Sequence, residues 1–258
     1  QPQVSAVTTA ALAGWGQTQI QALDVLQLAK LSTAQMASLT SAQVSQLTTA
    51  QITALSTAQV IAIDATDMAQ WSNTQLGVMS SAQVRVLSTA QLNGLSASQV
   101  AAFSSQSVQG LSTSQMRAMR SDQVAALTTG QLSKLVSSQI SAISSSAVSN
   151  MTTAQMASLA ANQVQAMTTG QLSVLGSAQI NNLSVTSVAA LRTQQVTALN
   201  TASLVGVQSS TLQSLVTGQY KALTTAQLLS LTTAQIQAIE AADIASLSTQ
   251  QLNALTTS

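Results

Sequence analysis

Apolar residues return at a fixed interval of eight along almost the whole chain. Every eighth residue from Val7 to Leu255 is apolar, and so is every eighth residue from Leu12 to Leu252. The register never slips, so residues 7–254 divide into 31 octads without gaps, in which Val7 occupies position one and Leu12 position six. The consensus octad reads L-[ST]-[ST]-A-Q-[VILM]-x-A, as in LTTAQITA of residues 47–54.

An interval of eight fits neither one long helix nor a strand. A continuous α-helix turns by about 100° per residue, so an eight-residue repeat drifts by about 80° each time and spreads its apolar residues around the axis. Positions one and six lie five residues apart and would fall on opposite faces of a strand. A short helix that restarts in every octad accommodates both positions, and a β-solenoid is the main competitor.

The polar positions carry the signals that begin a helix. Position two is Ser or Thr in 19 of the 31 octads, and position five is Gln in 23 of them. A hydroxyl residue followed three positions later by Gln is a capping box, and positions one and six have the spacing of a hydrophobic staple. Each octad therefore predicts a capped helix of about one and a half turns, which is stable only when it stacks on neighbours.

The predicted fold is all-α, an α-solenoid (superhelix) of about 31 very short capped helices, one per octad. A longer period accompanies the octad, because Gln is replaced at Asp67, Ser107, Ala147 and Ser187, each of which follows the previous one by five octads. We interpret this spacing as about five octads per 40-residue superhelical turn. Duplication of a block of five octads is the alternative explanation.

The octad register also predicts the domain organisation. Residues 1–6 lie outside the octads and are expected to form an N-terminal arm, while residues 7–258 form a single octad-repeat solenoid domain without an internal boundary. An open solenoid needs polar caps at its ends, and neither end of this sequence carries an obvious one. We therefore expect either a longer array or ends that stack on other subunits.

The composition excludes most catalytic and metal chemistry. The chain has no His and no Cys, only 5% of its residues are charged, and its formal net charge is +1. No imidazole base, thiolate nucleophile or zinc site of the usual kind can form, so we expect neither enzymatic activity nor a cofactor. The near-neutral charge argues against nucleic-acid binding. No apolar run approaches the roughly 18 residues of a membrane span, and the first residues show no signal-peptide pattern.

Two pairs of carboxylates are the strongest candidates for a metal or acid–base site. Asp64 with Asp67 and Glu240 with Asp243 are each separated by three residues. Such pairs could bind Ca²⁺ or act as acid and base. Both pairs occupy octad positions two and five, where a carboxylate favours a helix N-terminus. We expect capping rather than catalysis.

Three of the remaining charged residues lie close together in the sequence. Arg117, Arg120 and Asp122 form the densest charged cluster of the sequence. A charge cluster of this kind is usually a solvated surface group. A salt bridge between subunits is the alternative interpretation.

The glutamine row and the aromatic residues have two interpretations each. A row of exposed Gln, Ser and Thr could bind sugar or ice, whereas capping, extended to hydrogen bonds between layers, is the structural alternative. Trp15, Trp71, Phe103 and Tyr220 replace the usual aliphatic residue at position one or six. We expect them to be core residues rather than a carbohydrate-binding platform. No catalytic, cofactor-binding or metal-binding residue is therefore predicted.

The octads LTTAQITA, LSTAQVIA, LTTAQLLS and LTTAQIQA resemble the L-[ST]-x-x-Q-[VIL]-x-x arrays of large secreted bacterial surface and adhesin-like proteins. This resemblance implies an extracellular or cell-surface location and a role in adhesion, matrix or filament formation, and it transfers no active site. The expected function is that of a structural protein, a filament subunit or adhesin stalk that self-associates. The alternative is a module that binds carbohydrates or other surfaces.

Overall fold

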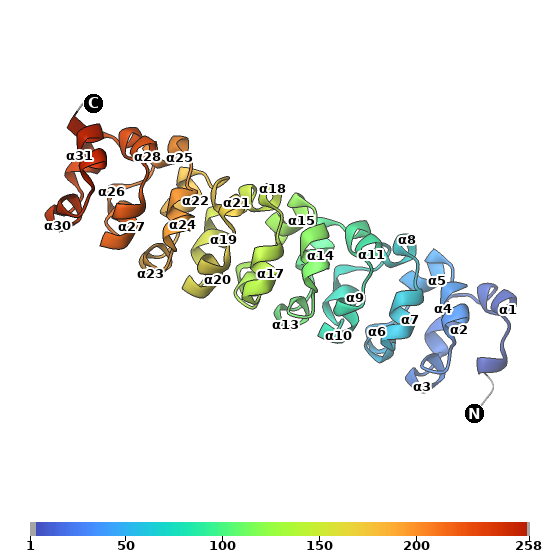
Figure 1. The fold of residues 1–258 in the computed structure, drawn as a ribbon. Coiled ribbons are helices and arrows are strands. Elements are labelled where there is room, and N and C mark those ends of the chain that lie inside the picture. Colours follow the sequence, from blue (N-terminus) through green and yellow to red (C-terminus); the bar gives the residue numbers. More distant parts are fainter. Residues whose placement is uncertain (1–3, 257–258) are drawn as a thin grey trace. The chain divides into compact units, whose positions relative to one another are not determined.

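All regular structure in residues 4–256, which the computed structural model describes, is helical, and those residues contain no strand. Contacts between residues divide the chain into two units, Gln1–Leu135 and Val136–Ser258. Within each unit, short helices follow one another with two- to four-residue connections and stack in successive layers (Figure 1). The predicted all-α repeat fold is confirmed, and the competing β-solenoid is wrong for the described residues.

Each helix corresponds to one octad. The first unit contains the 3₁₀-helix η1 (Val4–Ala6) and α1 (Thr9–Ala13), α2 (Gln17–Ala22), α3 (Val25–Leu28), α4 (Thr33–Ala37), α5 (Ser41–Ser45), α6 (Thr49–Ala54), α7 (Thr57–Ala62), α8 (Ala65–Met68), α9 (Asn73–Gly77), α10 (Ser81–Arg85), α11 (Thr89–Gly94), α12 (Ala97–Ala101), α13 (Ser105–Val108), α14 (Thr113–Ala118), α15 (Ser121–Ala126) and α16 (Thr129–Leu132). The second unit contains α17 (Ser137–Ala142), α18 (Ser145–Ser149), α19 (Thr153–Ser158), α20 (Ala161–Ala166), α21 (Thr169–Leu172), α22 (Ser177–Asn181), α23 (Val185–Ala189), α24 (Thr193–Thr197), α25 (Thr201–Val205), α26 (Ser209–Leu212), α27 (Thr217–Ala222), α28 (Thr225–Ser230), α29 (Thr233–Gln237), α30 (Ala241–Ala245) and α31 (Thr249–Thr256).

The capping box begins these helices as the sequence predicts. At α6, Thr48 has extended backbone angles, φ −72° and ψ 159°, and its Oγ1 accepts a hydrogen bond of 3.2 Å from the Gln51 amide. The Gln51 side chain in turn accepts from the Thr48 amide at 2.8 Å. The backbone returns to an extended conformation at Leu55, φ −60° and ψ 132°, so the helix ends after six residues.

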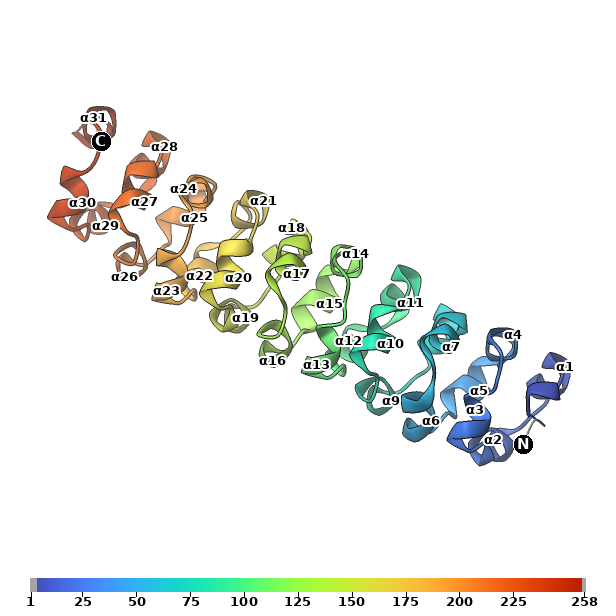
Figure 2. The same ribbon diagram turned by 60° about the horizontal axis from the view of Figure 1, so that its bottom comes forward.

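Helices three apart in sequence pack against one another within each unit. Examples are α5 with α8 and α8 with α11 in the first unit, and α25 with α28 in the second. In Figure 2, α1, α4, α7, α11 and α14 follow one another along one edge of the first unit, at intervals of three, three, four and three helices. One turn therefore takes between three and four octads.

This packing corrects the predicted superhelical turn of five octads. Glutamine side chains join each coil to carbonyls 28 and 31 residues earlier, a separation of less than four octads. The stacking distance is set by these contacts and not by the spacing of the replaced glutamines. Duplication of a block of five octads requires no match to the turn and stays a hypothesis for that period.

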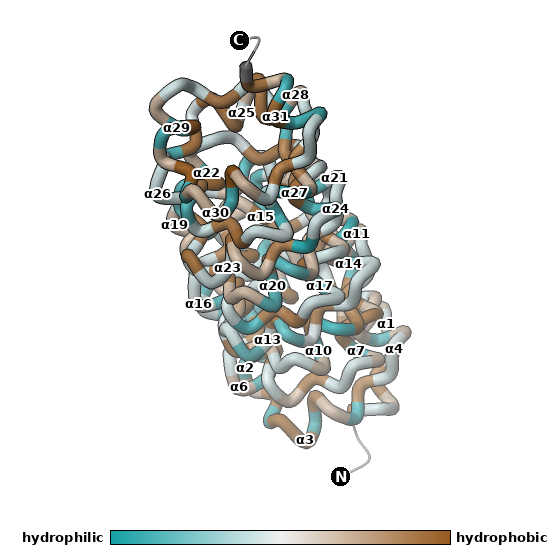
Figure 3. The backbone as a smooth tube through the Cα atoms, turned by 60° about the vertical axis from the view of Figure 1, so that its left-hand side comes forward, coloured by the Kyte–Doolittle hydropathy of each residue, from teal (hydrophilic) through white to brown (hydrophobic). Residues whose placement is uncertain are grey.

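The two apolar positions of the octad form the core. Every position-one residue from Leu23 to Leu247 and every position-six residue from Leu12 to Leu228 is buried. Figure 3 shows the hydrophobic residues recurring along the coils of both units. Burial of these rows supplies the stability that a four- to six-residue helix lacks in water.

The predicted domain boundaries are only partly covered by the structure. Within the expected arm, Val4–Ala6 form η1 and residues 1–3 lie outside the described residues, as do residues 257–258 of the expected solenoid domain. The single domain of residues 7–258 stays a prediction beside the two units. Among the described residues, no helix has the length and apolar character that a bilayer crossing requires.

Candidate functional site

The buried glutamines at position five are the main polar feature of both units. Gln59 is 2% exposed, and its Oε1 accepts a hydrogen bond of 2.9 Å from the Ser56 amide. Its Nε2 donates to the carbonyls of Leu28 at 2.8 Å and Leu31 at 2.9 Å. One side chain therefore begins its own helix and joins it to the coil below, with both amide protons and an oxygen lone pair in use.

The same three hydrogen bonds recur through the chain, and we call the row of position-five glutamines the glutamine ladder. In each case, one carbonyl lies 31 residues earlier at position six and the other 28 residues earlier at position one. Among the described residues, the glutamines with both bonds include Gln43, Gln51, Gln59, Gln83, Gln91, Gln115, Gln123, Gln131, Gln171, Gln179, Gln195, Gln219, Gln227, Gln235 and Gln251. These carbonyls lie at the C-terminal end of a helix, where the position-six carbonyl also accepts from the backbone amide three residues later, as that of Leu28 does from Leu31.

The capping interpretation of the glutamines, with its extension to bonds between layers, is confirmed. The other interpretation required exposed amides, and from Gln35 to Gln251 the ladder glutamines are buried, apart from the half-buried Gln99. Serine and threonine rows remain on the surface, as at the exposed Thr33 and Thr57.

Short residues at position five keep only part of the ladder. Ser203 donates to the Leu175 carbonyl, 28 residues earlier, at 2.7 Å. Ala147 has no side-chain donor at all. Asp243 instead accepts a hydrogen bond of 2.7 Å from the hydroxyl of Thr217, 26 residues earlier. The replaced octads therefore have fewer bonds between layers than the others.

Of the four carboxylates in the two pairs, only Asp64 makes the expected capping bond, whereas Asp67 and Asp243 accept from hydroxyls of an earlier coil. Asp64 accepts from the amide of Thr66 at 2.8 Å and from its hydroxyl at 2.6 Å, and these bonds hold the pKa of Asp64 below its ordinary value. Asp67 accepts from the hydroxyl of Ser41. Glu240 stands at an N-cap, but its side chain makes no capping bond, so the expectation is wrong there. No three His, Cys, Asp or Glu side chains gather within residues 4–256 in a way that could hold a metal ion.

The arginine cluster is a surface group within one chain. Arg120 and Asp122 form an ion pair of 3.0 Å, and both side chains are substantially exposed. The hydrogen bond from Arg120 lowers the pKa of Asp122. The Arg120 guanidinium also donates to the carbonyls of Asn93 and Leu95 in the preceding coil, while Arg117 lies exposed on α14. Arg120 thus replaces the usual hydroxyl cap with a contact between coils.

A second row of amides was missed by sequence reasoning. At octad position seven, expected to face outward, five side-chain amides donate to the carbonyl 25 residues later, at 3.0 to 3.3 Å. These residues are Gln21, Gln109, Gln165, Asn181 and Gln213. The recurrence of Gln or Asn at a position that most often carries Ala or Ser was the available signal.

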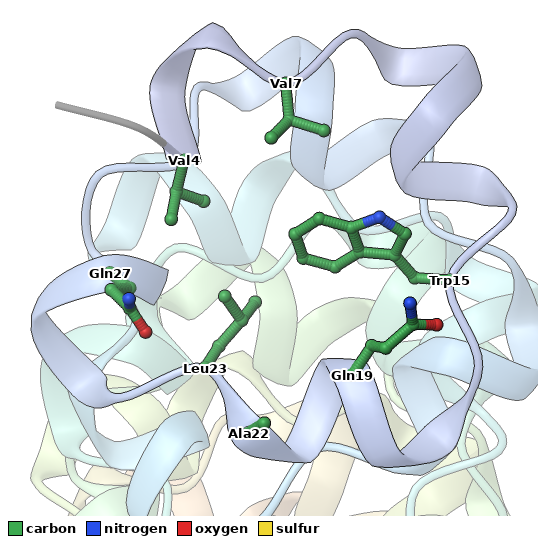
Figure 4. Close-up of a pocket in the computed structure, with 7 residues that line it drawn as sticks. All are labelled: Val4, Val7, Trp15, Gln19, Ala22, Leu23 and Gln27. Carbon is green, nitrogen blue, oxygen red and sulfur yellow. The ribbon is translucent and has the colours of Figure 1, made fainter.

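The first coil of the chain encloses an open cavity of about 450 Å³. Figure 4 shows the side chains of Val4, Val7, Trp15 and Leu23 converging on it. Trp15 is half-buried there, which corrects its expected place in the core, whereas Trp71, Phe103 and Tyr220 are buried as predicted.

Two glutamines at this cavity accept a hydrogen bond through the side-chain oxygen only. Gln19 accepts from the Gly16 amide at 2.7 Å, and Gln27 accepts from the Asp24 amide at 2.9 Å. Neither Nε2 donates to another of the described residues. From Gln35 onward the earlier coil is present, and Gln35 donates to the carbonyl of Val7 at 2.7 Å.

Comparison with known proteins identifies the chain as a repeat protein. The family model of the ALTTAQ repeat matches residues 68–105, 98–129 and 105–137. The three matches overlap, as expected for a short unit repeated in a constant register. No curated protein matches the chain.

Proposed function

We propose that this repeat protein is a non-enzymatic structural protein of the bacterial cell surface, a filament subunit or adhesin stalk assembled through the stacking of subunits. The observation that carries the proposal is the glutamine ladder, in which the polar side chains of the interior hold one coil on the next. Such a device extends without limit, because each coil offers the next one the same carbonyls.

The surface chemistry supports assembly over catalysis. A net charge of +1 gives weak protection against association, since soluble domains usually carry a larger net charge and many surface ions. Apart from Glu240, the described carboxylates engage in caps, coil contacts and a surface ion pair. The extracellular or cell-surface location rests on the resemblance of the octads to secreted bacterial adhesin-like arrays.

The second candidate is a module that binds carbohydrates or another surface. The exposed hydroxyls, such as those of Thr33 and Thr57, favour it, although the ladder glutamines do not contribute to such a surface. Hydroxyl rows without aromatic platforms would bind glycans weakly, and the buried Trp71 and Phe103 supply no platform.

Electron microscopy of the purified protein over a range of concentrations, beside a glycan array, separates the two. Regular fibres without glycan binding are expected for the structural protein. Monodisperse particles that bind particular glycans would replace it with the second candidate. Hydrolytic or transfer activity that is lost in Asp64→Asn, with folding unchanged, would contradict both.

A further inference from the structure

The helix α26 is left out of the glutamine ladder on both of its sides. The coil above reaches a helix through the glutamine 32 residues after the helix's own position five, as Gln59 reaches the carbonyls of Leu28 and Leu31. For α26, its own position five and the one 32 residues later are both replaced, by Thr211 and Asp243. No other two replaced glutamines of the 31 octads are 32 residues apart.

Below α26, the amide donor is missing. Thr211 is 9% exposed and makes no side-chain hydrogen bond within residues 4–256, so the carbonyls of Ile180 and Leu183 receive no bond from it. A glutamine at position five donates to both such carbonyls, as Gln219 does in the next octad. The interior of α26 therefore lacks the two bonds that join the next octad to the coil below.

Above α26, the side chain at the ladder position accepts instead of donating. Asp243 accepts a hydrogen bond of 2.7 Å from the hydroxyl of Thr217, and a carboxylate has no proton to offer the carbonyls of Leu212 and Leu215. The Leu212 carbonyl accepts from the hydroxyl of Tyr220 at 2.7 Å, a bond from the following octad and not from the coil above. The coil above therefore adds no ladder bond to α26.

The start of α26 and the core beside it are also weak. Gln208 stands at the N-cap without a side-chain capping bond, and the helix has only four residues, Ser209–Leu212. A cavity of about 20 Å³ lies against this helix, lined by Thr211 among aliphatic side chains. Every position-one and position-six residue from Leu172 to Leu215 is Leu, Ile or Val, so this part of the core has no Met or aromatic side chain to fill the space. A short helix that has lost packing contacts has little to hold it.

Two surface amides remain at the margins of this segment. The Gln208 amide donates to the side-chain oxygen of Asn181 at 2.8 Å, and the Gln213 side chain donates to the Ala238 carbonyl at 3.0 Å. Both bonds are exposed, so water competes for the same groups and each contributes less than a buried bond. Residues 207–215 are therefore held at their edges and poorly held in the core.

We propose that residues 207–215, with α26 at their centre, are a yield point, a segment that opens reversibly while the coils on both sides stay folded. Ladder glutamines with their bonds intact lie before and after it, at Gln195 and Gln219. The use of the yield point rests on the proposed function, because in a stalk or filament such a segment lengthens the chain under load before the ladder breaks elsewhere.

Hydrogen exchange of the full-length protein, followed by mass spectrometry, compares α26 with a matched helix. That helix is α21, which has the same length and lies 40 residues earlier. Thr168 caps α21, and Gln171 donates to two carbonyls of the coil below. Ser203 donates to the Leu175 carbonyl from the coil above. We expect protection factors about a hundredfold lower in α26 than in α21, because α26 lacks bonds on both sides.

Two substitutions restore the ladder, one from each side. Thr211→Gln supplies donors to the coil below and an acceptor for the Gln208 amide, and Asp243→Gln supplies donors from the coil above. Each should raise the protection of α26 by about tenfold, and the double variant should bring it near that of α21. In the reverse direction, Gln171→Thr should give α21 the same defect and lower its protection by about tenfold.

Ser210→Gln is the control, because it adds the same amide at an exposed position of the same helix and should leave the protection of α26 unchanged. Equal protection of α26 and α21, or equal effects of Thr211→Gln and Ser210→Gln, would overturn the proposal. Protection of α21 that survives Gln171→Thr would contradict it in the same way, even if Thr211→Gln disturbed the local fold.

Stretching of single molecules measures the opening itself. A molecule pulled by its two ends should show a first reversible extension of up to about 30 Å, the span of residues 207–215 when extended. This step should be absent from the double variant Thr211→Gln, Asp243→Gln, and its persistence there would refute the yield point. Absence of fibres in electron microscopy would contradict the proposed function without affecting these results, whereas a well-protected α26 in a fibre-forming protein would refute the yield point alone.

Discussion

At the scale of the residue, a neutral amide is the side chain that the ladder requires. Its oxygen accepts from the N-cap amide while its nitrogen donates to two carbonyls, as Gln91 does with Ser88, Val60 and Ile63. Glutamate has the same shape but no donor, and asparagine is one methylene too short to span the same distance. Gln therefore recurs because this buried position requires a side chain that can donate two hydrogen bonds and is long enough to reach the carbonyls of the earlier coil.

Gln91→Glu should destabilise the protein by on the order of 3–5 kcal/mol at neutral pH, because a buried carboxylate would face two carbonyls without a proton to donate. Burial raises the pKa of such a carboxyl in the folded state. The loss of folding stability should therefore be smallest below the ordinary pKa of Glu and grow as the pH rises above that pKa. Thermal unfolding at acidic and neutral pH measures this. Gln17→Glu, on the surface of α2, should show little change at either pH.

Close approach of two coils at one glycine gives a second prediction. A Cβ on Gly110 would lie 2.1 Å from the carbonyl oxygen of Ser81, so Gly110→Ala should force α13 away from α10 and cost at least about 1–3 kcal/mol. Gly218 lies within α27 with nothing within 4 Å of such a Cβ. Gly218→Ala should instead stabilise by about 0.5–1 kcal/mol. Denaturant midpoints that shift in the same direction for both variants would contradict this interpretation.

Tyr220 makes the stability depend on alkaline pH. Burial, with the charges of Asp243 and Glu240, raises its pKa from 10.0 to about 12. Because the folded state keeps the phenol proton that the unfolded state releases near pH 10, stability should fall by on the order of 2 kcal/mol between pH 10 and 12. Tyrosinate absorbance follows this single tyrosine without interference. In Tyr220→Phe, the part of this fall in stability with pH that is due to the phenol should disappear.

At the scale of the element, each helix is made by local capping and kept by its neighbours. Thr152 caps α19 through the Gln155 amide at 3.2 Å, and Gln155 accepts from the Thr152 amide at 2.8 Å. The next helix, α20, has Ala160 at its N-cap and keeps only the bond from the Ala160 amide to Gln163, at 2.9 Å. The fold therefore tolerates half of a capping box where stacking is intact.

This pair of helices gives reciprocal predictions. Thr152→Ala should cost about 1 kcal/mol, since it leaves the Gln155 amide without its acceptor. Ala160→Thr should add a similar amount, because the backbone at Ala160 already has the extended angles of an N-cap, φ −71° and ψ 158°. Differential scanning calorimetry of both variants measures the two shifts, and their combination should restore the original midpoint. Shifts of the same sign would contradict local capping as the cause.

The sequence predicts these helices because their signals are local. Thr48 and Gln51 lie three residues apart, so the capping box is visible in the octad itself. The turn of the superhelix is not visible, because it depends on which carbonyl Gln51 meets 28 and 31 residues earlier.

At the candidate site, too, local contacts can be predicted from the sequence, whereas contacts between coils cannot. The buried glutamines are predictable as caps, while the contact of Gln21 with the Gln46 carbonyl depends on what the next coil places opposite. Trp15 and Trp71 occupy the same octad position, yet Trp15 is half-buried, whereas Trp71 is buried and donates its indole N–H to the Val44 carbonyl at 2.9 Å. Their different burial cannot be deduced from the repeat.

At the scale of the whole molecule, each unit is a stack in which helices contact those three places away and are linked through Gln to the coil below. Stability in such a stack is the sum of terms for each octad and for each contact between neighbours. Damage to one octad should therefore weaken the adjoining coils and leave distant ones intact, unlike the all-or-none response of a small globular domain.

Hydrogen exchange measured by mass spectrometry tests this view with Gln91→Glu. Loss of the bonds to Val60 and Ile63 removes a link between α11 and the coil that contains α7 and α8. We expect exchange at neutral pH to accelerate tenfold or more in these helices and to a lesser degree in α14, which packs on α11. Helices α27 to α31 should keep their original rates, because several intact coils lie between them and the change along the chain. Uniform acceleration in all helices would show instead that the protein opens as one cooperative body.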